Sequence, residues 1–173
     1  NTPTVQGTGT PGDTITVTFP GGEVQTVVVG NTGSWSVTPT NPLADGLNNI
    51  SVTATDPAGN TSPATTVPVT IDTTPPSAPA ADVAAATVPC RSNTDNVTSD
   101  TTPTIAGTGV AGDTITVTMP GTGEVLTTVV AANGTWSVTP TQALAEGAAN
   151  VSVTATDPAG NTSAARAVLR RSS

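Results

Sequence analysis

The twelve residues SVTATDPAGNTS at positions 51–62 recur unchanged at positions 152–163. In both places an alternation of apolar residues with serine and threonine precedes Asp-Pro-Ala-Gly-Asn. Such a stretch predicts a half-buried β-strand that ends in a tight turn. An identical stretch of this length at two positions indicates that the chain of 173 residues contains an internal repeat.

Other motifs follow the same order in both copies. They are TPTVQGTG (2–9) with TPTIAGTG (102–109), GDTITVT (12–18 and 112–118) and WSVTPT (35–40 and 136–141). About 44 of 61 aligned positions are identical, and the offset grows from 100 to 101 residues where PGG becomes PGTG. This period exceeds the roughly 20–50 residues of solenoid repeats. Each copy is therefore expected to be a domain.

The spacing of strands and turns predicts the fold class. TITVTF (14–19) and its copy TITVTM (114–119) place apolar residues on one face and threonines on the other. PGGE (20–23) and PGTGE (120–124) predict hairpin turns. Short strands with turns about every 8–12 residues predict an all-β protein of two tandem immunoglobulin-like antiparallel β-sandwich domains. These domains contain no disulfides, because Cys90 is the single cysteine.

The predicted domains span residues 1–74 and 75–173, and the proline-rich segment 73–79 is the linker. ADVAAATV (81–88) has the alanine content of a helix but is short and bounded by prolines, and we interpret it as the first strand of the second domain. The first copy has no counterpart of this segment. We therefore expect domain 1 to lack its first strand and to expose a sandwich edge that a neighbouring strand could pair with. We also expect the chain to come from a longer array.

Composition excludes several classes of function. The chain has no His, no Lys, 4 Lys+Arg against 12 Asp+Glu, and a net charge of −8. Without His, a Ser-His-Asp triad or an imidazole metal site is excluded. An acidic chain without a basic patch is not expected to bind nucleic acid. No apolar run approaches about 18 residues, so we expect no membrane insertion. Aromatic residues are only 2%, so the predicted core is aliphatic and anchored by Trp35 and Trp136.

The ordered motifs TPTxxGTG, GDTITVT, W-S-V, VTATDPAGNTS and xDTTPP resemble bacterial immunoglobulin-like repeats. Such repeats form the extender regions of giant cell-surface adhesins and biofilm-associated proteins, including the calcium-dependent type I-secreted (RTX-type) ones. The resemblance implies an extracellular rod on the bacterial cell surface that projects an adhesive domain. It also implies calcium at and near the domain junctions. TVPCRS (87–92) and the tail AARAVLRRSS depart from the pattern.

The order of strands predicts where the acidic residues lie. In a seven-strand sandwich, the loops that carry Asp113 and Asp157 lie at the end of domain 2 that receives the linker. Asp45, Asp72 and Glu23 would lie at the end of domain 1 from which the linker leaves, so these carboxylates would converge on one junction. Clustered carboxylates repel each other unless a cation neutralises them. Calcium accepts 6–8 oxygen ligands in flexible geometry. We therefore predict a calcium at the junction, bound by Asp72, Asp113, Asp157 and Asp45.

A second candidate calcium site is the loop SNTDNVTSD at 92–100. Asp95, Asn96 and Asp100 offer oxygen ligands there, but without the frame of an EF-hand. The alternative interpretation is an Asx-turn loop, in which these side chains bond their own backbone. The same alternative holds for Asp56 and Asp157, which begin Asp-Pro-Ala-Gly-Asn turns.

Three functions remain open at this point. The first is a structural, calcium-stiffened spacer of a surface adhesin in cell adhesion or biofilm formation. The second is a sandwich module that binds glycan or protein, and the third is an accessory domain of a secreted hydrolase. We do not expect an enzyme, because the paired carboxylates lie at domain ends without a pocket-forming insertion. The expected partners are the neighbouring repeats of the same chain, and the expected state is a monomer.

Overall fold

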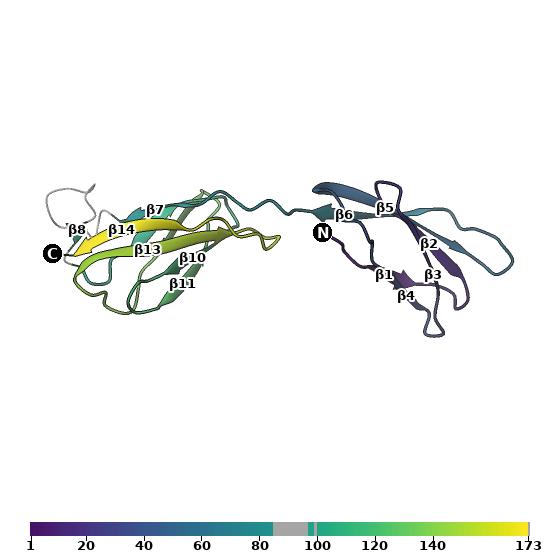
Figure 1. The fold of residues 1–173 in the computed structure, drawn as a ribbon, viewed down its shortest axis with the longest axis horizontal. Coiled ribbons are helices and arrows are strands. Elements are labelled where there is room, and N and C mark those ends of the chain that lie inside the picture. Colours follow the sequence, from purple (N-terminus) through teal and green to yellow (C-terminus); the bar gives the residue numbers. More distant parts are fainter. Residues whose placement is uncertain (85–96, 99, 173) are drawn as a thin grey trace. The chain divides into compact units, whose positions relative to one another are not determined.

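The chain folds into strands and loops in two compact units. The computed structural model describes residues 1–84, 97–98 and 100–172, and no helix occurs among them. Unit 1 is Asn1–Thr73 and unit 2 is Thr74–Ser173 (Figure 1). No helix that could span a membrane occurs in this described part.

Unit 1 packs a four-stranded sheet against a two-stranded one. Its strands are β1 (Val5–Thr8), β2 (Thr14–Thr18), β3 (Val24–Val28), β4 (Ser34–Val37), β5 (Gly46–Thr55) and β6 (Thr65–Ile71). The larger sheet has the order β3-β2-β5-β6, and the smaller is β1-β4. All these pairs are antiparallel.

Unit 2 repeats this arrangement and adds two strands. The added strands are β7 (Ala80–Val83) and β8 (Val97–Thr98). The others are β9 (Ile105–Thr108), β10 (Thr114–Thr118), β11 (Val125–Val129), β12 (Thr135–Val138), β13 (Gly147–Thr156) and β14 (Arg166–Ser172). The sheets have the orders β11-β10-β13-β14-β8 and β12-β9-β7. The β14–β8 pair is parallel, and the others are antiparallel. The predicted all-β fold of two tandem sandwiches is confirmed.

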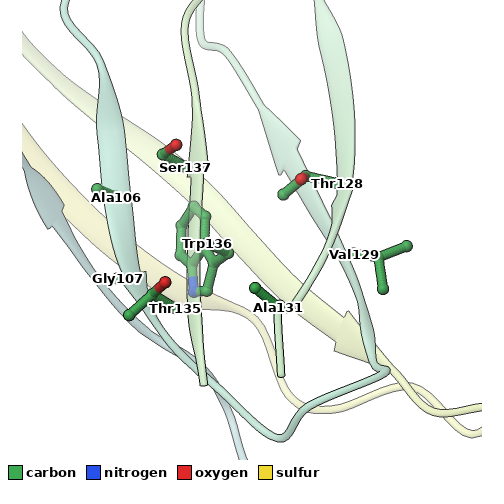
Figure 2. Close-up of a pocket in the computed structure, with 8 residues that line it drawn as sticks. All are labelled: Ala106, Gly107, Thr128, Val129, Ala131, Thr135, Trp136 and Ser137. Atoms are coloured by element: carbon green, nitrogen blue, oxygen red, sulfur yellow. The ribbon is translucent and has the colours of Figure 1, made fainter. Parts of the chain in front are cut away.

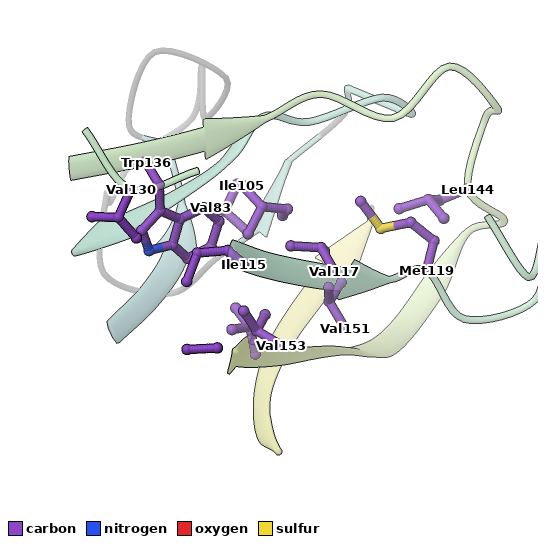
Figure 3. Packing of buried hydrophobic residues seen from close by; sticks show 12 residues of the cluster. Val83, Ile105, Ile115, Val117, Met119, Val130, Trp136, Leu144, Val151 and Val153 are labelled. Carbon is purple, nitrogen blue, oxygen red and sulfur yellow. The ribbon is translucent and has the colours of Figure 1, made fainter. Parts of the chain in front are cut away.

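The strand alternation positions the two cores. In β2, Ile15 and Val17 are buried while the threonines between them are only half-buried. Phe19, just beyond β2, is also buried. In unit 2, Trp136 is 5% exposed and lies at one end of the buried hydrophobic cluster (Figure 3). Trp35 is only half-buried against the core of unit 1. Packing of the tryptophans against an aliphatic core is therefore confirmed, but it is more complete in unit 2.

The extra residue of the second copy lies in a turn. In unit 1 the backbone N–H of Phe19 donates to the carbonyl of Glu23, at 2.8 Å, and in unit 2 Met119 donates to Glu124 at the same distance. Gly21 and Gly22 have φ angles of 91° and 88°, in the left-handed region where glycine is unstrained. Because the turn absorbs the insertion, the strands on both sides keep the same register as in unit 1.

The ambiguous segment at 81–88 begins as a strand. Its first residues belong to β7, which pairs with β9 so that Ala81 lies opposite Gly107 and Val83 opposite Ile105. Residues 85–88 lie outside the described part of the chain. Unit 1 has no described strand on the corresponding edge of β1. The smaller sheet therefore has two strands in unit 1 and three in unit 2.

Candidate functional site

Two aspartates lie side by side at one end of unit 2. The register of β10 and β13 places Thr114 opposite Thr156. Asp113 directly precedes β10 and Asp157 directly follows β13, so the antiparallel pairing brings them to neighbouring positions. Two residues far apart in the chain thus form one acidic pair, which is the juxtaposition predicted from the order of strands.

Asp113 is buried without a full set of partners. Its side chain is 3% exposed, and its Oδ2 atom has no hydrogen-bond partner among the described residues. Its backbone is well held, because its N–H donates to the carbonyl of Val110 and its carbonyl accepts from Val130. Burial, and then the charge of Asp157, raise the pKa of the Asp113 carboxyl. A buried carboxylate oxygen without a partner is costly.

Asp157 has the opposite electrostatic environment. Its Oδ1 accepts the backbone N–H of Asn161 at 2.9 Å, and its Oδ2 accepts the side-chain amide of Asn161 at 3.0 Å. These hydrogen bonds, led by the Asn161 side chain, lower the pKa of Asp157. The turn therefore holds an ionised carboxylate beside an acid that burial favours as neutral. A cation between the two would stabilise both in the ionised form.

The equivalent pair in unit 1 is Asp13 and Asp56. The register of β2 and β5 gives them the same relative positions, but Asp13 is only half-buried. In unit 2, Pro79 is buried and immediately precedes β7. The pairing of β7 with β9 places Pro79 opposite Gly109, at the start of the loop that carries Asp113. The segment before β7 therefore reaches the start of this loop in unit 2.

The other predicted junction ligands lie in unit 1. The register of β5 and β6 places Gly46 opposite Ile71, so Asp45 and Asp72 occupy neighbouring positions at the end of this pair. Both are exposed. Asp45 accepts hydrogen bonds from the N–H and hydroxyl of Thr73, at 3.2 and 2.8 Å. Its carboxylate therefore also holds the chain where β6 ends.

The second predicted loop site is only partly described. Asp100 accepts the backbone N–H of Thr102 at 2.8 Å, as an Asx-type turn requires. Asp95, Asn96 and Cys90 lie outside the described residues. Within the described part of either unit, no three Asp, Glu or Cys side chains lie close enough together to hold a metal.

Glu23, which strand order predicts near the junction, clamps a loop of unit 1. Its carboxylate accepts the backbone N–H groups of Thr40 and Asn41, at 2.7 and 3.0 Å, and the side-chain amide of Gln25. These bonds, led by the Thr40 N–H, lower the pKa of Glu23 to about 2. Glu124 holds the equivalent loop of unit 2 in the same way. The sequence signal for this clamp was available, because a glutamate stands 17 residues before the second threonine of WSVTPT in both copies.

A shallow hollow on unit 2 contains no titratable group. Small, apolar or hydroxyl side chains line it, and Figure 2 shows the indole of Trp136 at its centre. Its lining residues are Ala106, Gly107, Thr128, Val129, Ala131, Thr135, Trp136 and Ser137. None of them can act as a general acid or base.

The comparisons with known proteins agree with this repeated architecture. A family model, Bacterial Ig-like domain, matches residues 1–73 and again residues 75–170. The chain belongs to this family. Both units are thus bacterial Ig-like domains, and the predicted resemblance is confirmed. No curated protein sequence matches the chain.

Two solved structures are similar to these tandem Ig-like domains. One is described as a Ca²⁺-stabilized adhesin that helps an Antarctic bacterium reach out and bind ice, with 32% identity and a TM-score of 0.53. It aligns with 98% of this chain, which covers 43% of that structure's chain. The other is a 1.5-MDa bacterial ice-binding adhesin, with 31% identity and a TM-score of 0.49. It aligns with 99% of this chain, which covers 57% of that structure's chain. The chain thus spans about half the length of these structures. Its repeats resemble repeats of large bacterial adhesins.

Proposed function

We propose that the two Ig-like domains are spacer repeats of a bacterial surface adhesin, located outside the cell, which hold an adhesive region away from the cell. One observation carries this proposal. The whole chain consists of two copies of one bacterial Ig-like domain, and over 98% of its length it is similar to an adhesin at 32% identity. A spacer needs repeated, independently folded units, whereas a specific binding site needs only one differentiated copy.

The chemistry of the described surface supports a structural role rather than a catalytic one. Glu23 and Glu124 hold loops by hydrogen bonds, and hydrogen bonds from Asn161 orient Asp157 in its own turn. The hollow around Trp136 has no titratable lining. We infer that neither unit catalyses a reaction.

We further infer that calcium binds to unit 2 at Asp113 and Asp157. The support is the buried Oδ2 of Asp113, which lacks a partner, next to the ionised Asp157. Both offer hard oxygen ligands, and loop carbonyls and water would supply the remainder of the 6–8 that calcium takes. One similar adhesin is described as Ca²⁺-stabilized. The predicted contribution of Asp72 and Asp45 at the junction, and of Asp95 and Asp100 in the second loop, stays a prediction.

Bound calcium would supply positive charge where two carboxylates repel each other. The chain's own residues do the rest: the Asn161 amides orient Asp157, and the hydrogen bonds of Val110 and Val130 fix the backbone of Asp113. Binding would tie the loop before β10 to the loop after β13. These loops lie at the end of unit 2 from which β7 begins, so the linker-facing end would stiffen.

Thermal unfolding of the full chain in EDTA and in millimolar calcium tests the metal site, with magnesium as the control cation. We expect calcium to raise the melting temperature of unit 2 and magnesium to raise it less, because magnesium sheds its waters reluctantly. No change with calcium would contradict the metal site and leave the spacer role intact. Binding of the full chain to a glycan array or to host proteins would contradict the spacer role itself.

A further inference from the structure

One edge of the larger sheet is open in both units. Among the described residues, β3 pairs only with β2, and β11 pairs only with β10. A hollow lined by residues of β3 and β4 separates these two strands, and the hollow around Trp136 separates β11 from β12 in the same way. The next strand in the chain therefore leaves this edge uncovered. Because both units have the open edge, it is a property of the repeat.

The backbone of β3 has groups that point away from its sheet. The N–H of Val29, just beyond β3, donates to the carbonyl of Asp13 at 2.9 Å. Hydrogen-bonded positions alternate along an antiparallel pair. Alternate residues counted back from Val29 thus face β2, and the residues between them, Val24, Thr26 and Val28, face outward. No other described residue hydrogen-bonds to the outward backbone groups of these three.

The backbone of β11 is arranged in the same way. The N–H of Val130 donates to the carbonyl of Asp113 at 2.9 Å. The alternation then directs the backbone groups of Val125, Thr127 and Val129 outward. Each unit thus presents three residues with unpaired main-chain donors and acceptors at the same edge.

The outward positions carry apolar and uncharged side chains. In both strands they read valine, threonine, valine, and the valines are strongly exposed: Val24 55%, Val28 62%, Val125 58% and Val129 61%. Neither strand contains a charged residue or a proline, which are the usual means by which proteins protect an edge. The opposite edge of the sheet does have protection. Pro68 removes a donor from β6 in unit 1, and β8 pairs with the end of β14 in unit 2.

The pattern of outward residues is complementary to itself in an antiparallel pair. When two copies of β3 align about Thr26, Val24 of each copy lies opposite Val28 of the other. The two Thr26 residues then lie opposite each other on a two-fold axis. All these positions direct their backbone groups outward, so this register would form about six main-chain hydrogen bonds. The same holds for β11 about Thr127, and two-fold pairing is the commonest symmetry of homo-oligomers.

Charge favours the antiparallel direction. Glu23 directly precedes β3, so a parallel pair would bring the Glu23 carboxylates of two copies together. In the antiparallel pair they lie six residues apart along the strand direction, which is about 20 Å at roughly 3.4 Å per residue. This separation exceeds the Debye length of about 8 Å at physiological ionic strength. The net charge of −8 is therefore compatible with pairing at this edge.

We propose that the open edges of β3 and β11 bind a second copy of this chain, whose β3 or β11 adds in the antiparallel direction and extends the sheet. The occupant is a second copy because the edge complements itself in residue pattern, backbone register and charge. Main-chain hydrogen bonds provide affinity, and the cross-strand valine pairs fix the register. Lateral association goes beyond the spacer role, differs from the monomer expected from the sequence, and needs no calcium.

Sedimentation equilibrium of the full chain in EDTA measures the association without bridging metal. A contact of one strand pair is small, so we expect a weak complex with a dissociation constant near about 1 mM. Between about 0.05 and 1 mM chain, the weight-average mass should then rise by about half. A mass that stays constant over this range would overturn the proposal.

Amide hydrogen exchange identifies the surface that associates. Over the same range of concentration, exchange at Thr26 and Thr127 should slow by at least about twofold, because a comparable fraction of the edges is then paired. Exchange at Val27 and Thr128 should stay unchanged, because their backbone groups already face β2 and β10. Protection that appears elsewhere and spares Thr26 and Thr127 would show a different interface and refute the proposal.

Substitutions at the two-fold position provide the matched controls. Thr26→Lys with Thr127→Lys places like charges opposite each other and should abolish the association, while an edge strand tolerates lysine. Thr16→Lys with Thr116→Lys adds the same charge to the inner strands β2 and β10 and should leave most of the association. Thr26→Val with Thr127→Val keeps the β-branched shape and should retain it. Association that persists in the Thr26→Lys and Thr127→Lys variant would contradict pairing at these edges.

Discussion

Replacement of Asp113 by asparagine tests the electrostatics of the acidic pair in unit 2. The substitution keeps the shape of the side chain and removes its charge. In EDTA at pH 7, Asp113 is a 3% exposed carboxylate with one oxygen unpartnered, beside the ionised Asp157. We therefore expect the variant to be more stable than the wild-type chain, although most substitutions of a buried residue destabilise.

The magnitude follows from the cost of the orphan oxygen. An unsatisfied buried polar group costs about 1–3 kcal/mol, and more when it is charged. Asparagine keeps part of this cost but removes the charge and its repulsion with Asp157. We expect unit 2 to gain about 1–2 kcal/mol in EDTA. For a domain of this size, each kcal/mol raises the melting temperature by about 4–8 °C.

The pH dependence has a defined sign. Burial raises the pKa of Asp113 above its ordinary value of 3.8. The contribution of Asp113 to stability is therefore complete below that value and is lost as the pH rises through the raised pKa of the folded state. The advantage of the variant in EDTA should grow from pH 4 to pH 7 and shrink below the ordinary pKa.

Calcium should reverse the order of stability. At a concentration 100 times its dissociation constant, a ligand stabilises the folded state by about 2.7 kcal/mol. The wild-type chain should gain this stability, whereas Asp113→Asn, with a weaker ligand at the site, should gain much less. Asp13→Asn in unit 1 is the matched control and should change little, because Asp13 is only half-buried.

Hydrogen exchange read separately on peptides from each unit is the assay, in EDTA and in calcium, from pH 4 to pH 7. A variant less stable than wild type in EDTA at pH 7 would refute the electrostatic reasoning. If calcium stabilises the Asp113→Asn variant as much as it stabilises the wild type, the role of Asp113 as a ligand would be refuted.

Three further predictions concern the fold. Glu23→Gln should lower the melting temperature of unit 1 at pH 6. The pKa of Glu23 is lowered from 4.5 to about 2, so its contribution to the stability of unit 1 is present above pH 4.5 and is lost as the pH falls toward 2. The melting curves of the wild type and the variant should therefore converge near pH 2. Phe19→Ala should destabilise unit 1 by about 3–5 kcal/mol in urea unfolding, whereas Phe19→Met, which introduces the residue of the second copy, should cost less than about 1.5 kcal/mol. Gly107→Ala should displace β7 at a cost of about 1–3 kcal/mol, which faster amide exchange at Ala84 would report; unchanged exchange there would contradict the close approach of Ala80.

Much of the fold was predictable because its determinants are local. Alternation in TITVT predicted β2 and β10, and the glycines of the PGG and PGTG turns predicted the hairpins, since only glycine adopts their left-handed conformations without strain. The pairing of Asp113 with Asp157 was also predictable. Each residue adjoins a strand end, and antiparallel order brings these ends together.

The roles of individual carboxylates were less predictable. Strand order places Glu23 and Asp45 at the exit end of domain 1, but it does not predict their hydrogen-bond partners. In the structure, Glu23 closes a loop through Thr40 and Asn41, and Asp45 holds Thr73. A carboxylate's partners are set by the distance between loops that lie far apart in the chain, and no sequence pattern measures that distance.

The sequence by itself determined the repeat, the strands, the turns and the acid pair, because each depends on neighbouring residues or on strand order. Tertiary structure alone decided that the two copies differ. Trp35 and Trp136 stand in the same motif, yet one is half-buried and the other 5% exposed. Asp13 and Asp113 differ in the same way. For the tryptophans the physical reason is coverage: burial depends on which distant segment packs nearby, and β7 pairs with β9 in unit 2, whereas no described strand pairs with that edge of β1 in unit 1.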